Sequence, residues 1–175
     1  MHCASDIDNF PNVAGKSKSQ RRSGCPVSIS LETLGDRWSL LIVRDLMVRA
    51  NRTFKEFQQS GEGIATNILA HRLQKLEASR IIASEVDEAD GRRLNYRLTE
   101  KGIDLAPVLL DLLIWGARHE QTEAPCVIIA EMEKNREQVL AEARRRWQER
   151  DPTPLLPRFQ GAGIKRKSAR TRKPA

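Results

Sequence analysis

The sequence of 175 residues predicts a mainly helical fold of the α+β class. Three observations support this prediction. Apolar residues recur at three- and four-residue steps through the region 26–78, as they do in amphipathic helices. The region 81–98 holds two strand-like segments around a turn at Asp90-Gly91, and the region 101–120 is unusually apolar. Helices followed by a β-hairpin give the order of a winged helix-turn-helix, here with a C-terminal helix that we expect to form a dimer.

The first three helices are predicted from their boundaries. The first begins after Cys25-Pro26 and stops near Gly35, and Asp36 is placed to cap the second helix, which extends to Met47. Thr53-Phe54-Lys55-Glu56 fits a capping box, with the side chain of Thr53 bonding forward and that of Glu56 reaching back. That box starts a short third helix from Phe54 to Gln59, which Gly61 and Gly63 separate from the next one.

The fourth helix, near 65–78, has one apolar and one hydrogen-bonding face. The apolar positions at helical spacing are Ile64, Ile68, Leu69, Leu73 and Leu76. The opposite face carries Asn67, Ala70, His71 and Gln74. Amides and small polar groups are side chains that contact base edges in the major groove of DNA. The alternative is that these are ordinary exposed polar residues of a surface helix.

The hairpin is predicted as strands 81–86 and 93–98. In the second strand Leu94, Tyr96 and Leu98 alternate with polar residues, which is typical of a half-buried strand. Arg92 and Arg93 stand near the turn, where they could contact a phosphate or the minor groove. Alternatively they pair with the acidic residues of the same hairpin, which are Glu85, Asp87, Glu88 and Asp90.

The helix predicted from Lys101 to about Glu120 follows a cap at Thr99. Pro107 removes one helical hydrogen bond, so we expect a kink or a late helix start there. Apolar residues cover more than one stripe of this helix, which favours burial by the domain on one flank and by a second copy on the other. We expect the dimer interface at Leu109, Leu112, Leu113 and Trp115, together with the first helix. The alternative is a central core helix.

The basic surplus lies at the two ends of the chain. Residues 1–24 carry four Lys or Arg and two Asp, and residues 151–175 carry seven Lys or Arg and one Asp. Residues 25–150 hold 19 basic and 20 acidic residues, so the net charge of +7 describes the ends and not the domain. We therefore expect a flexible arm over 1–24, a domain over 25–120, an additional helix within 121–150 (from Ile128 to about Glu149) and a disordered basic tail over 151–175.

Several classes of protein are disfavoured. Three cysteines at long spacings and three histidines suggest neither a disulfide framework nor a metal site, and we expect no cofactor. No catalytic motif such as a phosphate-binding loop is present, so we expect no enzyme activity. No apolar run is long enough for a membrane span and no signal peptide is visible, so we expect a cytoplasmic protein without membrane contact.

Several motifs, in order, resemble the HxlR-type transcriptional regulators of bacteria. They begin with Cys25-Pro26-Val27 and the run from Leu34 to Leu46, in which Gly35-Asp36-Arg37-Trp38 stands near the start. The later motifs are Phe54-Lys55-Glu56-Phe57, Gly63-Ile64, Leu69 to Glu77, Tyr96 to Gly102, and Trp115-Gly116. The resemblance spans roughly Cys25 to Glu120.

The resemblance implies a homodimeric winged-helix regulator that binds operator DNA. It also implies that a small electrophile, oxidant or metabolite could act as effector, in some members through a cysteine at the position of Cys25. Two positions depart from the family pattern. Ala65 stands where Ser or Thr usually caps the helix, so Thr66 or the turn at Gly63 must substitute. Arg80 stands where Gly is favoured after the helix.

We therefore predict a homodimeric, sequence-specific regulator that binds double-stranded DNA through the helix near 65–78. Asn67, His71 and Gln74 would face base edges, and the neighbouring contacts to phosphates or bases would come from Thr66, Arg72, Lys75, Arg92 and Arg93. One alternative is a redox- or electrophile-sensing regulator in which Cys25 is a reactive thiol beside Arg21 and Arg22, and not a small buried apolar residue. The other is a winged-helix adaptor for protein partners, with nonspecific nucleic-acid affinity.

Overall fold

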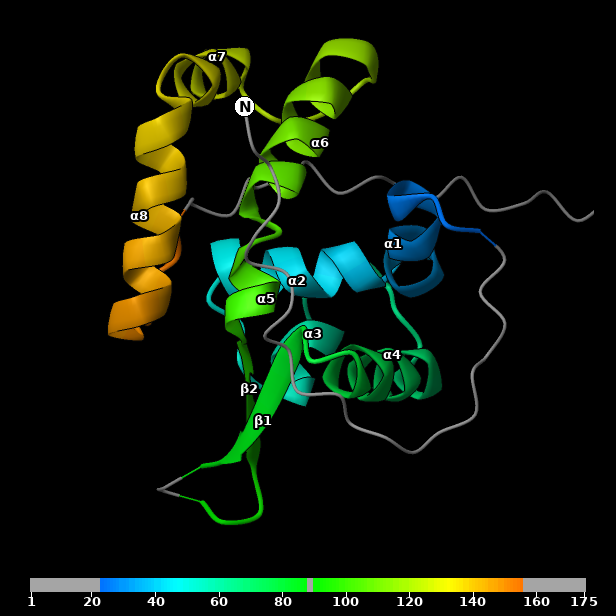
Figure 1. Cartoon of the computed structure of the whole chain (residues 1–175). Coiled ribbons are helices and arrows are strands. Elements are labelled where there is room, and N and C mark those ends of the chain that lie inside the picture. The colour runs from blue at the N-terminus through cyan, green and yellow to red at the C-terminus, as the bar shows by residue number, and fades with distance from the viewer. Residues whose placement is uncertain (1–22, 88–89, 156–175) are drawn as a thin grey trace, which may run out of the picture.

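A computed structural model describes residues 23–87 and 90–155 of the chain. Its N-terminal half is helical, with α1 (Pro26–Leu34), α2 (Ser39–Val48), α3 (Phe54–Gln58) and α4 (Thr66–Ala78). The hairpin of β1 (Ile82–Val86) and β2 (Leu94–Leu98) follows. The C-terminal half contains α5 (Glu100–Ile103), α6 (Ala106–His119), α7 (Cys126–Lys134) and α8 (Arg136–Glu149). This order confirms the predicted mainly helical fold with a winged helix-turn-helix (Figure 1).

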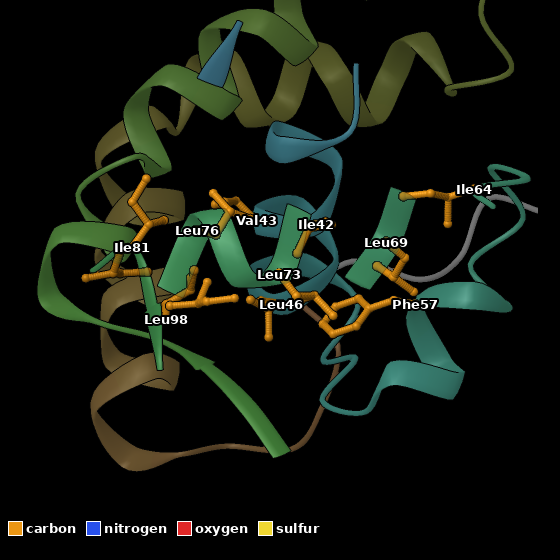
Figure 2. Close-up of a cluster of buried hydrophobic side chains, with 12 residues drawn as sticks. Ile42, Val43, Leu46, Phe57, Ile64, Leu69, Leu73, Leu76, Ile81 and Leu98 are labelled. Atoms are coloured by element: carbon orange, nitrogen blue, oxygen red, sulfur yellow. The ribbon is translucent and has the colours of Figure 1, made fainter. Parts of the chain in front are cut away.

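The main hydrophobic core lies between α2, α3, α4 and the base of the hairpin. Its most buried side chains include Val43 and Leu46 of α2, Phe57 of α3, and Leu69 of α4 (Figure 2). Burial of each large apolar side chain contributes about 1.5–3 kcal/mol to stability. Ile68, which the helical spacing placed on the buried face, is instead 36% exposed, because it lies at the edge of that face.

The predicted helix starts are largely confirmed. Thr53 and Glu56 form both hydrogen bonds of the capping box before α3. The side chain of Asp36 accepts hydrogen bonds from the backbone N–H groups of Trp38 and Ser39, at 2.9 and 3.0 Å, and so satisfies donors at the start of α2. Thr99 accepts from the N–H of Gly102 at the start of α5.

The two strands pair antiparallel, with Ile82 opposite Leu98 and Val86 opposite Leu94. A bridge between Thr53 and Asn95 adds a short third segment to this sheet, which the sequence patterns did not predict. Only the base of the hairpin is packed on the core: Leu98 is 2% exposed, whereas Leu94 is 45% exposed. The predicted half-buried alternation is therefore wrong at the outer end of β2, because the hairpin extends beyond the core there (Figure 1).

The helix predicted from Lys101 to Glu120 is two helices. α5 ends at Ile103, and α6 starts one turn later with Pro107 in its first turn, which confirms the late start that Pro107 predicted. The α5 helix lies close to the chain before β1, because a Cβ at Gly102 would come within 2.1 Å of the carbonyl oxygen of Ile81.

The single helix predicted from Ile128 to Glu149 is wrong, since α7 and α8 are separate. Asn135 ends α7 and precedes α8 in a non-helical conformation, and its side-chain amide donates to the carbonyl of Glu131. The two helices fold back on the domain, where Ile129 and Met132 of α7 pack against α6 in a second core. The indole N–H of Trp147 in α8 donates to the carbonyl of Leu98 at 2.8 Å.

The predicted arm and tail lie mostly outside the described residues. Of the arm over 1–24 only residues 23 and 24 are described, and of the tail only residues 151–155. The described start of the tail is bound to the fold, which corrects the predicted disorder there. The N–H of Leu155 donates to the carbonyl of Val48 at 2.8 Å, and Arg146 donates to the carbonyl of Thr153 at 3.0 Å.

Candidate nucleic-acid interface

The α4 helix presents a polar face to solvent from a rigid base. Leu69, Leu73 and Leu76 are each at most 2% exposed and fix the helix against the core. Asn67, His71 and Gln74 are all exposed on the opposite side, as the spacing predicted. In Figure 1 the hairpin extends beyond α4 on one side of the molecule, while α6 and α7 lie at the other end. The face of α4 is therefore free of the C-terminal helices.

The start of α4 is set by backbone turns and not by a side-chain cap. Ala65 is the N-terminal boundary residue in an extended conformation, and no side chain caps the helix by a hydrogen bond. Gly61 and Gly63 adopt φ angles of +94° and +72°, a region that favours glycine. The hydroxyl of Thr66 accepts from the side-chain amide of Gln58 at 2.9 Å, which joins α3 to α4. Of the two substitutes expected for the missing cap, Thr66 forms no cap hydrogen bond, and the left-handed turn at Gly63 precedes the helix.

Arg72 and Lys75, which the sequence assigned to DNA contacts, are bound within the chain. The guanidinium of Arg72 lies 3.3 Å from Asp36, and its side chain is 23% exposed. The ammonium of Lys75 donates to the carbonyl of Glu32 at 2.7 Å. Arg72 therefore connects α4 to the loop before α2, and Lys75 connects α4 to the end of α1. Both charged groups are thus bound within the chain.

Arg92 and Arg93 are exposed at the turn of the hairpin. Their backbone N–H groups donate to Asp90, but their guanidinium groups take no part in the ion pairs found among the described residues. Glu85, which the sequence offered as a partner, instead lies 3.2 Å from both Arg97 and Arg150. Pairing of Arg92 or Arg93 with Glu85 is therefore wrong, whereas Glu88, another of the acidic residues that the sequence offered, lies outside the described residues.

The surface also includes residues of α3 that the sequence analysis did not single out. Lys55 and Gln58 are exposed on that helix. Lys55, Arg92 and Arg93 line one hollow of about 720 Å³ between α3 and the hairpin turn. The only sequence signal for this surface is that Lys55 is a basic residue in the helix before α4. Its position beside the hairpin turn could not be predicted, because it depends on how the chain folds.

Two carboxylates that cap helices are held in their charged form. Partial burial acts to raise the pKa of Asp36, but hydrogen bonds from Ser39 and Trp38 and the charge of Arg72 outweigh it, so this pKa lies below its usual value. Burial likewise opposes ionisation of Glu56, and the backbone N–H groups of Arg52 and Thr53 lower the pKa of Glu56 overall. These groups stabilise the helices beside α4 and do not carry chemistry.

Cys25 is exposed at the N-terminal end of α1, and its carbonyl accepts from the N–H of Ile29. The interpretation of Cys25 as a small buried apolar residue is therefore wrong. Cys126 at the start of α7 is also exposed. Among the described residues, no cluster of three or more His, Cys, Asp or Glu could hold a metal ion. No helix in the described ranges is both long and apolar enough to cross a membrane.

An exposed polar helix, the short helix α3 before it and a hairpin with two arginines at its turn after it define a winged helix-turn-helix protein. The model of the HxlR-like helix-turn-helix family matches residues 33–124, over half of the chain. The chain belongs to the HxlR-like helix-turn-helix family.

Individual relatives agree with this assignment. The transcriptional regulator YodB of Bacillus subtilis (strain 168) is 34% identical over 93 residues, which cover 53% of this chain and 82% of YodB. The solved structure of PA1607, a candidate transcription factor, has a TM-score of 0.54 at 39% identity and covers 59% of this chain and 71% of PA1607. The redox regulator HypR in its oxidized form has a TM-score of 0.50 at 29% identity and covers 56% of this chain and all of HypR. The predicted class, a helix-turn-helix transcriptional regulator, is confirmed.

Proposed function

We propose that this chain binds operator DNA as a homodimer, with α4 in the major groove and the hairpin turn beside it. Asn67, His71 and Gln74 would contact base edges, because they are exposed together on the helix whose opposite face is fixed in the core. Arg92 and Arg93 would contact phosphates or the minor groove, together with Lys55. The single observation that carries the proposal is the polar face of α4, on which Asn67, His71 and Gln74 are exposed and which the C-terminal helices in the described part of the chain leave free.

Thr66, Arg72 and Lys75 have a different role in this proposal. Because the three side chains bind Gln58, Asp36 and Glu32, they would orient α4. A phosphate contact of Arg72 or Lys75 would first have to break these bonds. We therefore assign the base contacts to Asn67, His71 and Gln74 and the phosphate contacts to the hairpin turn.

The homodimer would form through the outer flank of α6 and through α1. Val108, Leu112 and Trp115 are 49%, 50% and 54% exposed, and their spacing places them on one side of α6. Val27 and Leu31 of α1 are 67% and 57% exposed and also share one side of their helix. Leu109 and Leu113 are half-buried against the chain's own cores, so the proposed interface is centred on Leu112 and Trp115.

The experiment that tests the DNA-binding proposal is competition. A preferred duplex is first selected from random DNA with the full chain, and labelled duplex is then titrated in excess random competitor at fixed salt. Specific binding should survive the competitor, because a regulator binds its site typically about 10³–10⁷ times more tightly than other DNA. Binding that the competitor abolishes would support the adaptor alternative, in which the basic ends give only nonspecific affinity.

The exposure of Cys25 favours a second candidate function, which is control of operator binding by an oxidant or electrophile. The thiol lies on α1, which belongs to the proposed dimer surface, so its modification would alter how the two copies of α4 are spaced. A mild oxidant should change operator affinity of the wild type and leave Cys25→Ser unaffected, with Cys126→Ser as the matched control. An equal response of Cys25→Ser and the wild type would contradict a sensing role of Cys25.

A further inference from the structure

The C-terminal helices and the winged-helix part of the chain line an apolar cavity that is open to solvent on one side. Its volume is about 320 Å³. The walls come from α2, α6, α7 and α8, and representative lining residues are Leu40, Met47, Leu109, Leu113, Leu140 and Ala143. The family match ends at residue 124, so α7 and α8 lie outside it and the cavity combines the family domain with this chain's own C-terminal region.

The cavity recedes into the molecule and is not a flat helix face. Of the described residues that line it, only Leu112 and Thr122 are exposed, and these two mark its opening at the outer edge of α6. The remaining lining side chains are buried or half-buried. A second copy of the chain would meet the outward side of α6, which carries Val108, Leu112 and Trp115, so that Leu112 belongs both to the proposed interface and to the rim of the cavity. The shape of this space therefore suits a small molecule better than a partner helix.

The lining chemistry selects an uncharged ligand. Arg44 is the one charged residue among the described lining residues, and its guanidinium is already bound to Asp45 at 2.6 Å and to Glu62 at 2.9 Å. Burial of an ionised group without a partner is strongly unfavourable. A volume of 320 Å³ lies at the lower end of the usual range for ligand sites, about 300–1,000 Å³. The cavity thus fits a compact apolar molecule, such as a neutral aromatic compound of a few rings.

The walls of the cavity are connected to both parts of the DNA-binding surface. Ala143 of α8 lines the cavity, and on the same helix Trp147 donates to Leu98 of β2. Arg150 at the end of α8 lies 3.2 Å from Glu85 of β1. On the other side, α2 contributes lining residues and packs against α4. A shift of α8 or α2 on binding would therefore reach the hairpin and α4.

We propose that this cavity binds a small, uncharged, apolar effector whose occupancy changes the affinity for DNA. The effector role rests on the operator binding proposed above. Ligand binding in the cavity does not depend on that proposal. Coupling of this kind is reciprocal, so operator DNA must change the affinity for the ligand by the same factor as the ligand changes the affinity for DNA.

The test uses the full chain and the neutral fluorescent probe N-phenyl-1-naphthylamine. Probe fluorescence should show saturable binding at one site per chain. Ala117→Leu fills the cavity from α6 and should weaken probe binding at least tenfold. The matched control Ala130→Leu, an exposed position of α7 outside the lining, should bind as the wild type does. Gly116→Leu is a second filling variant, because a Cβ at Gly116 meets no atom within 4 Å and the helix should accept it.

The same titration is repeated with the selected operator duplex, and saturating probe should change operator affinity at least threefold. Probe binding that is not saturable, or that both filling variants leave unchanged, would overturn the site. Probe binding that weakens as protein concentration rises would show that a second copy of the chain competes for the cavity. This result would also overturn the proposed ligand site. Unchanged operator affinity in saturating probe would overturn the effector role. Failure of operator binding itself is distinguishable, because it would appear in the wild type without any probe.

Discussion

Asp36 is the residue whose local role has the widest structural consequences. Its carboxylate accepts from two backbone N–H groups at the start of α2 and from the hydroxyl of Ser39, and it lies 3.3 Å from Arg72 of α4. The side chain of Asp36 thus caps α2, which contributes to the main hydrophobic core, and orients α4, which is proposed to contact DNA. Glu56 has a comparable local role at α3.

The pH dependence of stability follows from these two carboxylates. Hydrogen bonds hold the pKa of Asp36 and the pKa of Glu56 below their ordinary values in the folded chain, despite partial burial. A lowered folded pKa means that the stabilisation is present above the unfolded pKa, about 4, and is lost as pH falls through the folded pKa. The melting temperature should therefore decrease as pH is lowered from about 5 to 3.

Asp36→Ala tests the origin of this dependence. At pH 7 it should lower the free energy of unfolding by about 1 kcal/mol, because it removes a cap and the partner of Arg72. It should also make the melting temperature less sensitive to pH in the acidic range. Glu120→Gln, at an exposed position after α6, is the control and should leave the dependence as in the wild type. An unaltered pH profile for Asp36→Ala would contradict this account of Asp36.

At the scale of elements, the C-terminus of α4 carries a measurable strain. Arg80 has a φ of +56°, and the N–H of Ile81 donates to the carbonyl of Leu76 while that of Arg80 donates to the carbonyl of Glu77. This is the Schellman motif, whose left-handed position usually holds glycine. Arg80, which stands where the family pattern favours glycine, adopts this left-handed conformation itself.

Arg80→Gly should therefore raise the free energy of unfolding, by about 1 kcal/mol, because a left-handed conformation costs a side-chain-bearing residue about 1–2 kcal/mol and glycine little. Chemical denaturation measures the change. Ser79→Gly, one residue earlier at a φ of −83°, is the matched control and should not stabilise the chain. A lower stability of Arg80→Gly than of the wild type would show that the side chain of Arg80 matters more than its backbone strain.

The elements that sequence patterns predicted well are those with local signals. The capping box at Thr53 and the helix-breaking effect of Pro107 depend on neighbours in the chain, and both predictions were confirmed. The engagement of Lys75 by Glu32 depends on packing between distant segments, which periodicity does not report. The break at Asn135 was missed because the apolar spacing continues across it. The exposed and buried faces of α4 could both be predicted, because the helical repeat determines which residues lie on each side of the helix.

The exposed side of α6 is the surface through which we expect the homodimer to form. Leu112→Glu places a charge in the centre of the proposed two-fold interface and should weaken dimerisation at least tenfold, about 1.4 kcal/mol. Leu112 is half exposed, so the monomer should remain folded, which circular dichroism checks while sedimentation measures assembly. Val127→Glu, 80% exposed on α7, is the control and should not dissociate the dimer. A wild type that sediments as a monomer at micromolar concentration would contradict the proposed interface.

At the scale of the whole molecule, the proposed DNA-binding surface and the proposed effector cavity occupy different ends. In Figure 1, α4 and the hairpin lie on one side, while α6 and α7 lie toward the other. The apolar cavity is lined by residues of α2, α6, α7 and α8. Residues 25–150 carry nearly balanced charge, so the total charge of this part does not favour DNA. In our proposal its affinity would come from individual residues such as Arg92 and Arg93. The seven basic residues beyond position 150 would add sequence-independent affinity.

The most direct test of the account is the affinity of Gln74→Ala for a complete set of single-base variants of the selected operator, compared with the wild type. If α4 contacts base edges, the wild type should discriminate by about 1–3 kcal/mol at each contacted base pair. Gln74→Ala should lose that discrimination at one base pair of each half-site and keep it elsewhere, while Gln138→Ala, an exposed amide on α8, should keep all of it. A uniform loss of affinity across every variant and random DNA, with unchanged discrimination, would contradict base recognition by Gln74 of α4.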